Sequence, residues 1–341
     1  MNIADSKYNT FALVREMFET PGIIGNFNFQ QTRAIANRLR SVDGLLVTGE
    51  GSSRIFPAKN FIHCNRTWGR RMAIVTECSR QCMEYNFSGW GVIASSNSGQ
   101  TAETIDLLIK LEQEMHEPRF AVTANPNGKI LEFANDSIVL SCGKEEAVAA
   151  TKSVVEQALV YQSLLYNGGD IVVGGYPESA RQASASGKQI LEAEYEASMI
   201  EALVKADTIY WAGRNNGVAE ELSLKSCEIA RQKSVFLEGT ILLHGVEEIM
   251  QPNDVVVLID PFEAEWERIK HRYVDALNMN IIAIAPNQTP FDTIIIPTLA
   301  HFDSYFQLFA GWNLLVQVGV AHNYNLDKPQ RARKIGNEYT A

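Results

Sequence analysis

Hydrogen-bond donors gather in one short segment, Ser96–Thr101, whose sequence is SNSGQT. An apolar run, Gly91–Ser95, precedes it and a helix-like stretch follows, so it is expected to form a turn between a buried strand and a helix. In a parallel sheet such a turn lies at the carboxyl end of the strand, where the new helix presents unpaired N–H groups and the positive end of its dipole. Gly99 permits close approach of the backbone. The pattern predicts a phosphate-monoester site that needs no lysine, with side-chain donors from Ser96, Asn97, Ser98 and Thr101.

Helix capping by Ser98 or Thr101 is the alternative interpretation of this turn. Capping accounts for one hydroxyl, whereas four polar residues around a glycine exceed what it requires, so anion binding is favoured. A second turn, Gly49–Arg54, also follows a predicted strand, and its Ser52 or Ser53 is expected to face the same site. Arg54 occupies the place of the third glycine of a dinucleotide-binding fingerprint, which argues against a nicotinamide enzyme.

Three charged residues, Glu221, Lys225 and Glu228, are spaced i, i+4 and i+7 and therefore share one face of a predicted helix. On the residues alone, a solvated Glu–Lys pair contributing about a few tenths of a kcal/mol is the favoured interpretation. His244 follows the apolar run Ile241–Leu243, where a single histidine is more often structural.

Composition narrows the class of protein. The chain has 341 residues with 30 Lys and Arg against 40 Asp and Glu, a formal charge of −10. Nonspecific nucleic-acid binding needs a positive field, so no nucleic-acid partner is expected, although a local anion site is compatible with this charge. No apolar run approaches the ~20 residues of a membrane span, and the N-terminus does not resemble a signal peptide. A cytoplasmic protein without a membrane partner is predicted.

Metal and redox cofactors are not expected either. The cysteines form no CxxC pair, and the histidines have no metal-ligand spacing. Reduced, mostly buried thiols are predicted for Cys64, Cys78, Cys82, Cys142 and Cys227.

Short apolar runs alternate with amphipathic stretches, which is typical of parallel α/β sheets. The first five predicted strands are Gly44–Gly49, Met72–Thr76, Gly91–Ser95, Phe120–Thr123 and Ser137–Leu140. The second five are Thr208–Ala212, Ser234–Leu237, Val255–Ile259, Ile281–Ala285 and Thr293–Ile296. Between the two sets, helices are expected over Val148–Leu165 and from about Glu178 to Val204, with a domain boundary near Gly174–Gly175. The fold class is therefore α/β, with two domains that each contain a five-stranded parallel sheet flanked by helices in three layers.

Over roughly residues 30–341, segments occur in the order seen in the tandem sugar isomerase (SIS) domain family. The chain resembles the isomerase module of glucosamine-6-phosphate synthase and stand-alone phosphosugar isomerases, deaminases and deglycases. The matching segments are GEGSS, SSNSGQTAET, EEAVAATKSVVEQ, GRNNGVAEELSLKSCEIA, LLHG and DKPQRARK. The resemblance implies an N-terminal helical segment (1–29), two SIS domains (30–172 and 173–322) and a C-terminal loop (323–341) that folds over the active site.

The resemblance also implies roles for individual residues. Phosphate would be held by Ser53, Ser96, Asn97, Ser98 and Thr101. The remaining substrate contacts would come from Val148, Ala150 and Glu221, with Ala150 standing where a serine is common in the family.

The family's catalytic glutamate matches Glu228, a general base for C1 and C2 of an open-chain sugar, and this reverses the preference for a solvated helix face. Lys225 would keep that carboxylate ionised or stabilise a developing enediolate oxygen. His244 matches the ring-opening histidine, which a neighbouring subunit often donates. Lys334 matches a lysine that can form an imine with a keto sugar, the alternative being a basic, solvated chain end.

The predicted function is a phosphosugar isomerase or deaminase acting on an amino- or amino-acid-linked sugar 6-phosphate. Ring opening would precede C1–C2 proton transfer and, where the substrate carries nitrogen, hydrolysis of an imine. Glutaminase activity is not expected, because no catalytic cysteine stands at the start of the chain. The alternatives are a non-catalytic sugar-phosphate sensor and simple aldose–ketose isomerisation.

Three structural expectations accompany this function. A homodimer is expected if His244 serves the partner's site. One phosphate site per chain is expected, because no SGxT-like loop follows the segment VVVLIDP. The tail after His322 is expected to be loose unless a site holds it.

Overall fold

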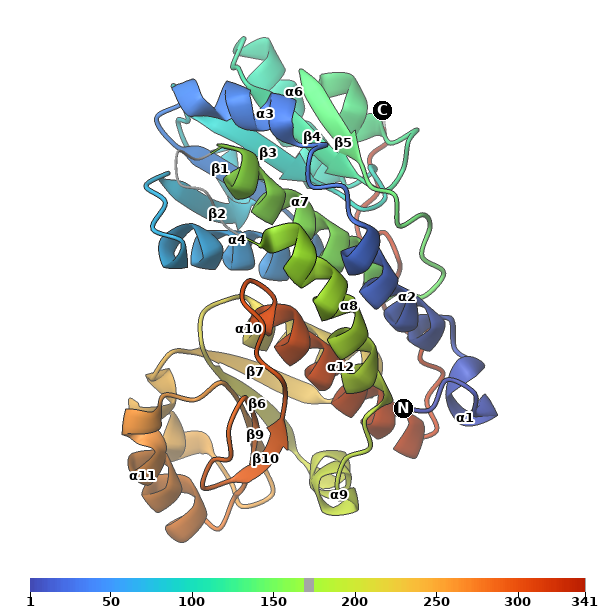
Figure 1. Cartoon of the computed structure of the whole chain (residues 1–341), viewed down its shortest axis with the longest axis vertical. Helices are drawn as coiled ribbons and strands as arrows, with labels where there is room; N and C mark the ends of the chain where they lie inside the picture. The colour runs from blue at the N-terminus through green and yellow to red at the C-terminus, as the bar shows by residue number, and fades with distance from the viewer. Residues whose placement is uncertain (169–174, 341) are drawn as a thin grey trace. The chain divides into compact units, whose positions relative to one another are not determined.

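The computed structural model describes residues 1–168 and 175–340 and divides the chain into two compact units (Figure 1). The first, here called the loop unit, comprises Gly22–Glu145, Ala150–Ala180 and Ala332–Ala341. The second, here called the helix unit, comprises Met1–Pro21, Glu146–Ala149 and Arg181–Arg331. The domain boundary predicted between residues 172 and 173 lies outside the described residues.

The loop unit is built on a parallel five-stranded sheet of order β2-β1-β3-β4-β5. Its strands are β1 (Leu45–Gly49), β2 (Ile74–Cys78), β3 (Gly91–Ser95), β4 (Arg119–Thr123) and β5 (Asp136–Val139). Its helices are α3 (Arg33–Arg38), α4 (Ile55–Thr67), α5 (Ser79–Cys82), α6 (Ala102–Gln113) and α7 (Lys152–Gly168). Leu45 and Val47 belong to the core beneath α3, α4 and α7, while Leu46 belongs to the core beneath α6. Both faces of the sheet are thus covered, which explains the continuous apolar strands.

The helix unit repeats this connectivity in a second parallel sheet of order β10-β9-β8-β6-β7. Its strands are β6 (Thr208–Gly213), β7 (Lys233–Glu238), β8 (Val255–Ile259), β9 (Asn280–Ala285) and β10 (Asp292–Ile295). Its helices are α1 (Ser6–Asn9), α9 (Ala197–Lys205), α10 (Val218–Lys225), α11 (Trp266–Ile269) and α12 (Asp303–Ala321). Two more helices, α2 (Ala12–Asn26) and α8 (Tyr176–Glu192), contain residues of both units.

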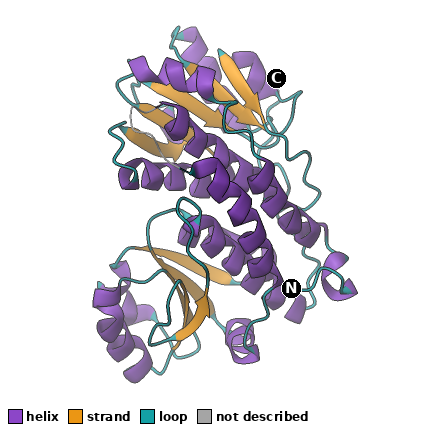
Figure 2. Ribbon diagram, in the orientation of Figure 1, coloured by secondary structure: helices purple, strands orange, loops and turns teal. Residues whose placement is uncertain are grey.

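All ten predicted strands are present, and the predicted α/β fold with two five-stranded parallel sheets is confirmed (Figure 2). In the loop unit the connections from β1 and β3 leave toward different neighbours in the strand order. The turns that follow β1 and β3 therefore border the crevice at the carboxyl ends of the strands, the usual ligand position in such sheets.

The strand boundary at β2 and the start of α7 differ from the sequence prediction. β2 begins at Ile74 rather than at Met72, in parallel register with Leu45. α7 begins at Lys152 rather than at Val148. The Glu145 carboxylate accepts the N–H of Thr151 at 2.7 Å and thus satisfies a donor at the helix start.

The single helix predicted over Glu178–Val204 is wrong: α8 ends at Glu192 and α9 starts at Ala197. At this break the Ala193 carbonyl accepts hydrogen bonds from groups outside the helix. The Asn313 side-chain amide donates to Ala193 at 2.9 Å, and the chain's own N-terminal ammonium donates to Ala193 at 3.0 Å. Tertiary contacts therefore terminate a helix that the local sequence would continue.

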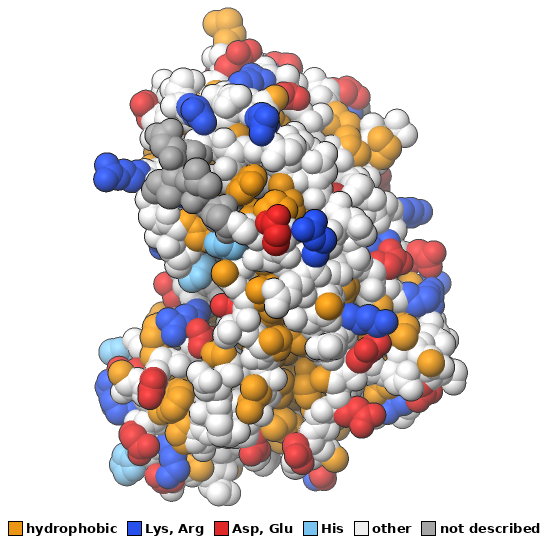
Figure 3. Space-filling view, in the orientation of Figure 1, with side chains coloured by type: hydrophobic (Ala, Val, Ile, Leu, Met, Phe, Trp, Pro, Cys, Tyr) orange, Lys and Arg blue, Asp and Glu red, His pale blue; other side chains and the backbone are white. Residues whose placement is uncertain are grey.

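On the face seen in Figure 3, acidic and basic side chains are interspersed rather than gathered into areas of one sign. In the described part of the chain, none of the helices has both the length and the apolar character needed to cross a bilayer.

Candidate functional site

The loop between β3 and α6 has its carbonyl groups engaged and several donors left over. The Asn97 carbonyl accepts from the Ala124 N–H at 3.2 Å, and the Ser98 carbonyl accepts from the Asn125 side chain at 2.9 Å. Within residues 1–168 and 175–340, the backbone N–H groups of Asn97 and Ser98 have no hydrogen-bond partner. A turn with satisfied acceptors and unpaired donors at a helix start favours an anion.

The hydroxyls of this loop form a cluster. Ser96 is 1 % exposed, and its Oγ lies 2.8 Å from Thr101 Oγ1 and 3.4 Å from Ser98 Oγ. Each hydroxyl can rotate to donate to a ligand. Thr101 stands at the N-cap of α6 but makes no side-chain cap hydrogen bond, and Ser98 Oγ accepts from the Gln100 N–H at 3.1 Å. The capping alternative is therefore wrong for Thr101 and Ser98.

A tight backbone contact holds the loop in shape. Gly99 has φ +68°, and a Cβ placed on it would lie 2.5 Å from the Gly128 Cα. Only glycine satisfies both the conformation and the space. At the other end of the loop, the buried Tyr161 hydroxyl hydrogen-bonds to Ser95 Oγ and so anchors the end of β3.

Ser53 lies beside this loop. Gly49 ends β1 opposite Ser95 of β3, and a Cβ on Gly49 would meet the Ser95 carbonyl at 2.7 Å and Ser53 Cβ at 3.5 Å. The structure thus brings together the five residues that were predicted to bind phosphate.

Glu145, which the sequence analysis did not single out, connects the loop to the chain's end. Its side chain is fully buried, and Oε2 accepts from Asn97 Nδ2 at 2.7 Å and from Ser153 Oγ at 2.8 Å. Lys334 Nζ lies 3.3 Å from the same oxygen. Burial raises the pKa of Glu145, but the Lys334 charge and the hydrogen bonds from Thr151 and Ser153 lower it below its ordinary value.

The C-terminal tail is held down by the loop rather than loose. Glu338 forms an antiparallel bridge with Thr101. The Ala102 N–H donates to the Asn337 carbonyl at 3.0 Å, and the Tyr339 N–H donates to the Gln100 carbonyl at 2.8 Å. The tail therefore pairs with the turn that carries the phosphate donors.

In the helix unit, the predicted Glu–Lys–Glu face is confirmed as a contact cluster. Lys225 Nζ lies 2.6 Å from Glu228 Oε2 and 3.2 Å from Glu221 Oε1. The side chains of Lys225 and Glu221 are 0 % exposed and that of Glu228 is 21 % exposed, so the solvated-face alternative is wrong. Burial lowers the pKa of Lys225, but the charges of Glu228 and Glu221 raise it above its ordinary value.

A π turn over Ser226–Ala230 continues α10 and carries Glu228. Inside it, Ser226 Oγ accepts from the indole N–H of Trp211 on β6 at 2.7 Å, which fixes the turn against the sheet. The turn ends at Arg231 with φ +54°. Oε2 of Glu228 thus contacts Lys225, and the side chain remains partly exposed to solvent. This arrangement suits a base that must reach a substrate.

His244 lies beyond the carboxyl end of β7 in the same sheet. Glu228 precedes β7, whereas His244 is exposed and follows it. The six residues of β7 span about 17 Å from the first to the last, at ~3.3 Å per residue. In one chain, Glu228 and His244 therefore flank opposite ends of β7.

The two residues predicted for sugar contacts are half-buried, Val148 in the helix unit and Ala150 in the loop unit. The Val148 N–H donates to the Asp327 carbonyl at 3.1 Å. Among the described residues, no cluster of three or more His, Cys, Asp or Glu side chains is placed to hold a metal ion.

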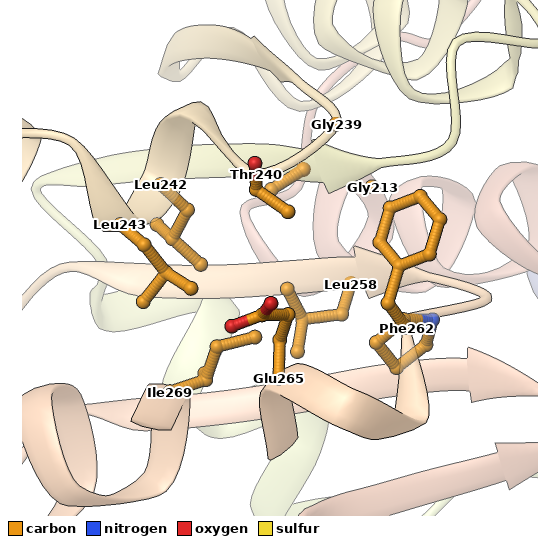
Figure 4. Close-up of a pocket in the computed structure, with 11 residues that line it drawn as sticks. Gly213, Gly239, Thr240, Leu242, Leu243, Leu258, Phe262, Glu265 and Ile269 are labelled. Carbon is orange, nitrogen blue, oxygen red and sulfur yellow. The ribbon is translucent and has the colours of Figure 1, made fainter. Parts of the chain in front are cut away.

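A small cavity lies at the carboxyl ends of the helix-unit strands β6, β7 and β8 (Figure 4). It encloses about 10 Å³ between Leu242, Leu258 and Phe262, room for about one water. Typical small-molecule sites are about 300–1,000 Å³, so this cavity does not fit a sugar phosphate.

The comparisons with known proteins agree with this fold. No family model matches the chain. It is 26 % identical over 254 residues to the glutamine–fructose-6-phosphate aminotransferase (isomerizing) of Streptococcus pneumoniae, a match over 70 % of this chain and 42 % of the relative. The enzyme of the same name from Lactiplantibacillus plantarum is 24 % identical over 255 residues, which is 70 % of this chain and 42 % of that relative. The chain thus spans less than half the length of these curated relatives.

Among solved structures, the C-terminal domain of glucosamine-fructose-6-phosphate aminotransferase from Francisella tularensis has a TM-score of 0.75 at 15 % identity, covering 95 % of this chain and 100 % of that one. Glucosamine-6-phosphate deaminase from Thermotoga maritima has a TM-score of 0.72 at 16 % identity, covering 95 % and 99 %. Tagatose-6-phosphate ketose/aldose isomerase from Escherichia coli has a TM-score of 0.74 at 16 % identity, covering 96 % and 99 %. The predicted resemblance is confirmed: the chain is similar in sequence to the isomerizing aminotransferases named above and shares the fold of these three solved structures.

Proposed function

We propose that this chain is a phosphosugar isomerase or deaminase that acts on an amino- or amino-acid-linked sugar 6-phosphate. The observation that carries the proposal is the buried Lys225 between Glu221 and a partly exposed Glu228. A sensor needs only the phosphate loop, whereas the buried cluster costs desolvation free energy and holds a partly exposed carboxylate beside a cation, an arrangement suited to acid–base chemistry. The curated relatives and solved structures named above include isomerases and a deaminase of sugar phosphates.

In the proposed reaction the loop donors bind the phosphate and position the sugar chain. His244 transfers a proton between the ring oxygen and the anomeric hydroxyl, which opens the ring. Glu228 then removes the proton from C2, the electron pair moves onto the C1 carbonyl oxygen, and the ammonium of Lys225 stabilises the negative charge. Return of the proton to C1, with transfer of a proton from the C2 hydroxyl or amine to the C1 oxygen, gives the C2 ketone, or a C2 imine when C2 carries nitrogen. In a fructosyl-amino acid the nitrogen is on C1, so Glu228 instead removes the proton from C1 and the electron pair moves onto the C2 oxygen. Return of the proton to C2, with transfer of the nitrogen's proton to the C2 oxygen, then gives a C1 imine. Water adds to the imine carbon and the amine leaves.

The test compares wild type with Glu228→Gln on 6-phosphorylated sugars, amino sugars and fructosyl-amino acids. Deuterium uptake from solvent at C1 or C2, or amine release, that is lost in Glu228→Gln supports the enzyme. Glu201→Gln is the control, because its carboxylate is on the same unit and 64 % exposed. Sugar-phosphate binding by the wild type without exchange or release across the panel would favour the sensor instead.

We also propose a homodimer in which each subunit supplies His244 to its partner's site. The position of His244 at the end of β7 opposite to Glu228 supports this arrangement. Mixing inactive Glu228→Gln and His244→Gln chains is expected to restore activity, because a hybrid dimer contains one intact site. No recovery after subunit exchange, verified by mass spectrometry of the mixed dimers, would contradict it.

A further inference from the structure

The phosphate loop has a negative neighbour and no cation of its own. The segment Ser96–Thr101 contains no Lys or Arg, and Asn97 donates directly to the buried carboxylate of Glu145. An ionised carboxylate this close to an anion site opposes phosphate binding, and burial limits its screening by water.

The tail brings the compensating charge. Lys334 Nζ is 3.3 Å from Glu145 Oε2, and its side chain is 30 % exposed. The tail also reaches a second carboxylate, since Asn337 Nδ2 donates to Glu103 Oε1 at 2.9 Å in the first turn of α6. Docking of the tail therefore changes the charge around the loop without adding a cation inside it.

We propose that Glu145 is a positioning residue that couples the C-terminal tail to the phosphate loop. Through one carboxylate it holds Asn97 of the loop and Lys334 of the tail, so that the docked tail cancels the charge that would otherwise repel the phosphate. The inference rests on the proposed function of the loop as a phosphate site.

The coupling works in both directions. If tail docking strengthens phosphate binding, a bound phosphate strengthens tail docking by the same factor. A bound anion is therefore expected to protect the tail from trypsin, which cleaves after Arg331, Arg333 and Lys334.

The test measures the affinity for inorganic phosphate, glucosamine 6-phosphate and fructose 6-phosphate by calorimetry. Lys334→Gln is expected to weaken binding at least about 5-fold, the lower end of typical coupling between sites. Adding Glu145→Gln to Lys334→Gln is expected to restore affinity, because the double variant has neither the cation nor the carboxylate that it compensates. Glu146→Gln, a neighbouring side chain that is 75 % exposed, is the control and is expected to change nothing.

The outcomes separate the inference from the function on which it rests. The coupling is overturned if Lys334→Gln binds the anions as tightly as the wild type. It is also overturned if the double variant binds as weakly as Lys334→Gln, because that result would mean that Lys334 contacts the ligand directly. Thermal melting confirms that each variant is folded at the temperature of the binding measurement. Failure of the wild type to bind any of the three anions overturns the proposed phosphate site, and the inference with it.

Discussion

Replacement of Lys225 by methionine tests the buried charge cluster most directly. Methionine keeps nearly the same length, so the change removes the charge without opening a large cavity. At an effective dielectric constant of about 20, charges separated by 2.6 Å and 3.2 Å attract by about 6 and 5 kcal/mol. Desolvation offsets much of this attraction, and loss of one partner from a buried cluster leaves a net cost of about 3–5 kcal/mol.

The assay is thermal melting of the helix unit within the whole chain. At about 2 °C per kcal/mol for a large domain, Lys225→Met is expected to lower Tm by about 6–10 °C. Adding Glu221→Gln is expected to recover part of the loss, because a fully buried carboxylate no longer lacks its cation.

A surface pair gives the matched control. Lys205 and Glu201 form an i,i+4 contact of 2.5 Å with side chains 72 % and 64 % exposed. Lys205→Met is therefore expected to change the free energy of unfolding by no more than about 0.5 kcal/mol. A Lys225→Met variant as stable as Lys205→Met at pH 7 would refute the reasoning.

Two further predictions concern the phosphate loop. Gly99→Ala is expected to abolish sugar-phosphate binding in calorimetry, because the added Cβ would lie 2.5 Å from the Gly128 Cα. Gly69→Ala is the control and should retain binding, because Gly69 has the same φ of +68° but no atom within 4 Å of an added Cβ. The comparison separates the steric effect at Gly99 from the backbone strain that both variants share. Glu145 has a pKa below its ordinary 4.5 in the folded chain, so its stabilising contribution is complete above that value and is lost as the pH falls through the folded pKa. The Tm difference between wild type and Glu145→Gln should therefore be largest near pH 6 and shrink below pH ~4, and a pH-independent difference would contradict this assignment.

Much of the fold was predictable because the signals are local. The inner strands of both sheets are short, mostly apolar runs between turn residues, and burial on both faces of a parallel sheet requires that composition. The loop at Ser96–Thr101 was predictable for a similar reason, since the hydroxyls, the glycine and the helix start lie within a few residues of one another. The i, i+4, i+7 spacing likewise placed Glu221, Lys225 and Glu228 on one face.

The sequence by itself determined the strands, the hydroxyl-rich loop and the shared face of the charged helix, because these depend on neighbours a few residues apart. Only the tertiary structure decided which charges are buried and which residues meet. Glu145 and Lys334 lie 189 positions apart in the chain, and no local pattern predicts that they form an ion pair. The burial of Lys225 depends on what packs over α10, and the separation of His244 from Glu228 follows from the direction of β7. Long-range packing sets the local dielectric and the distances on which such chemistry depends.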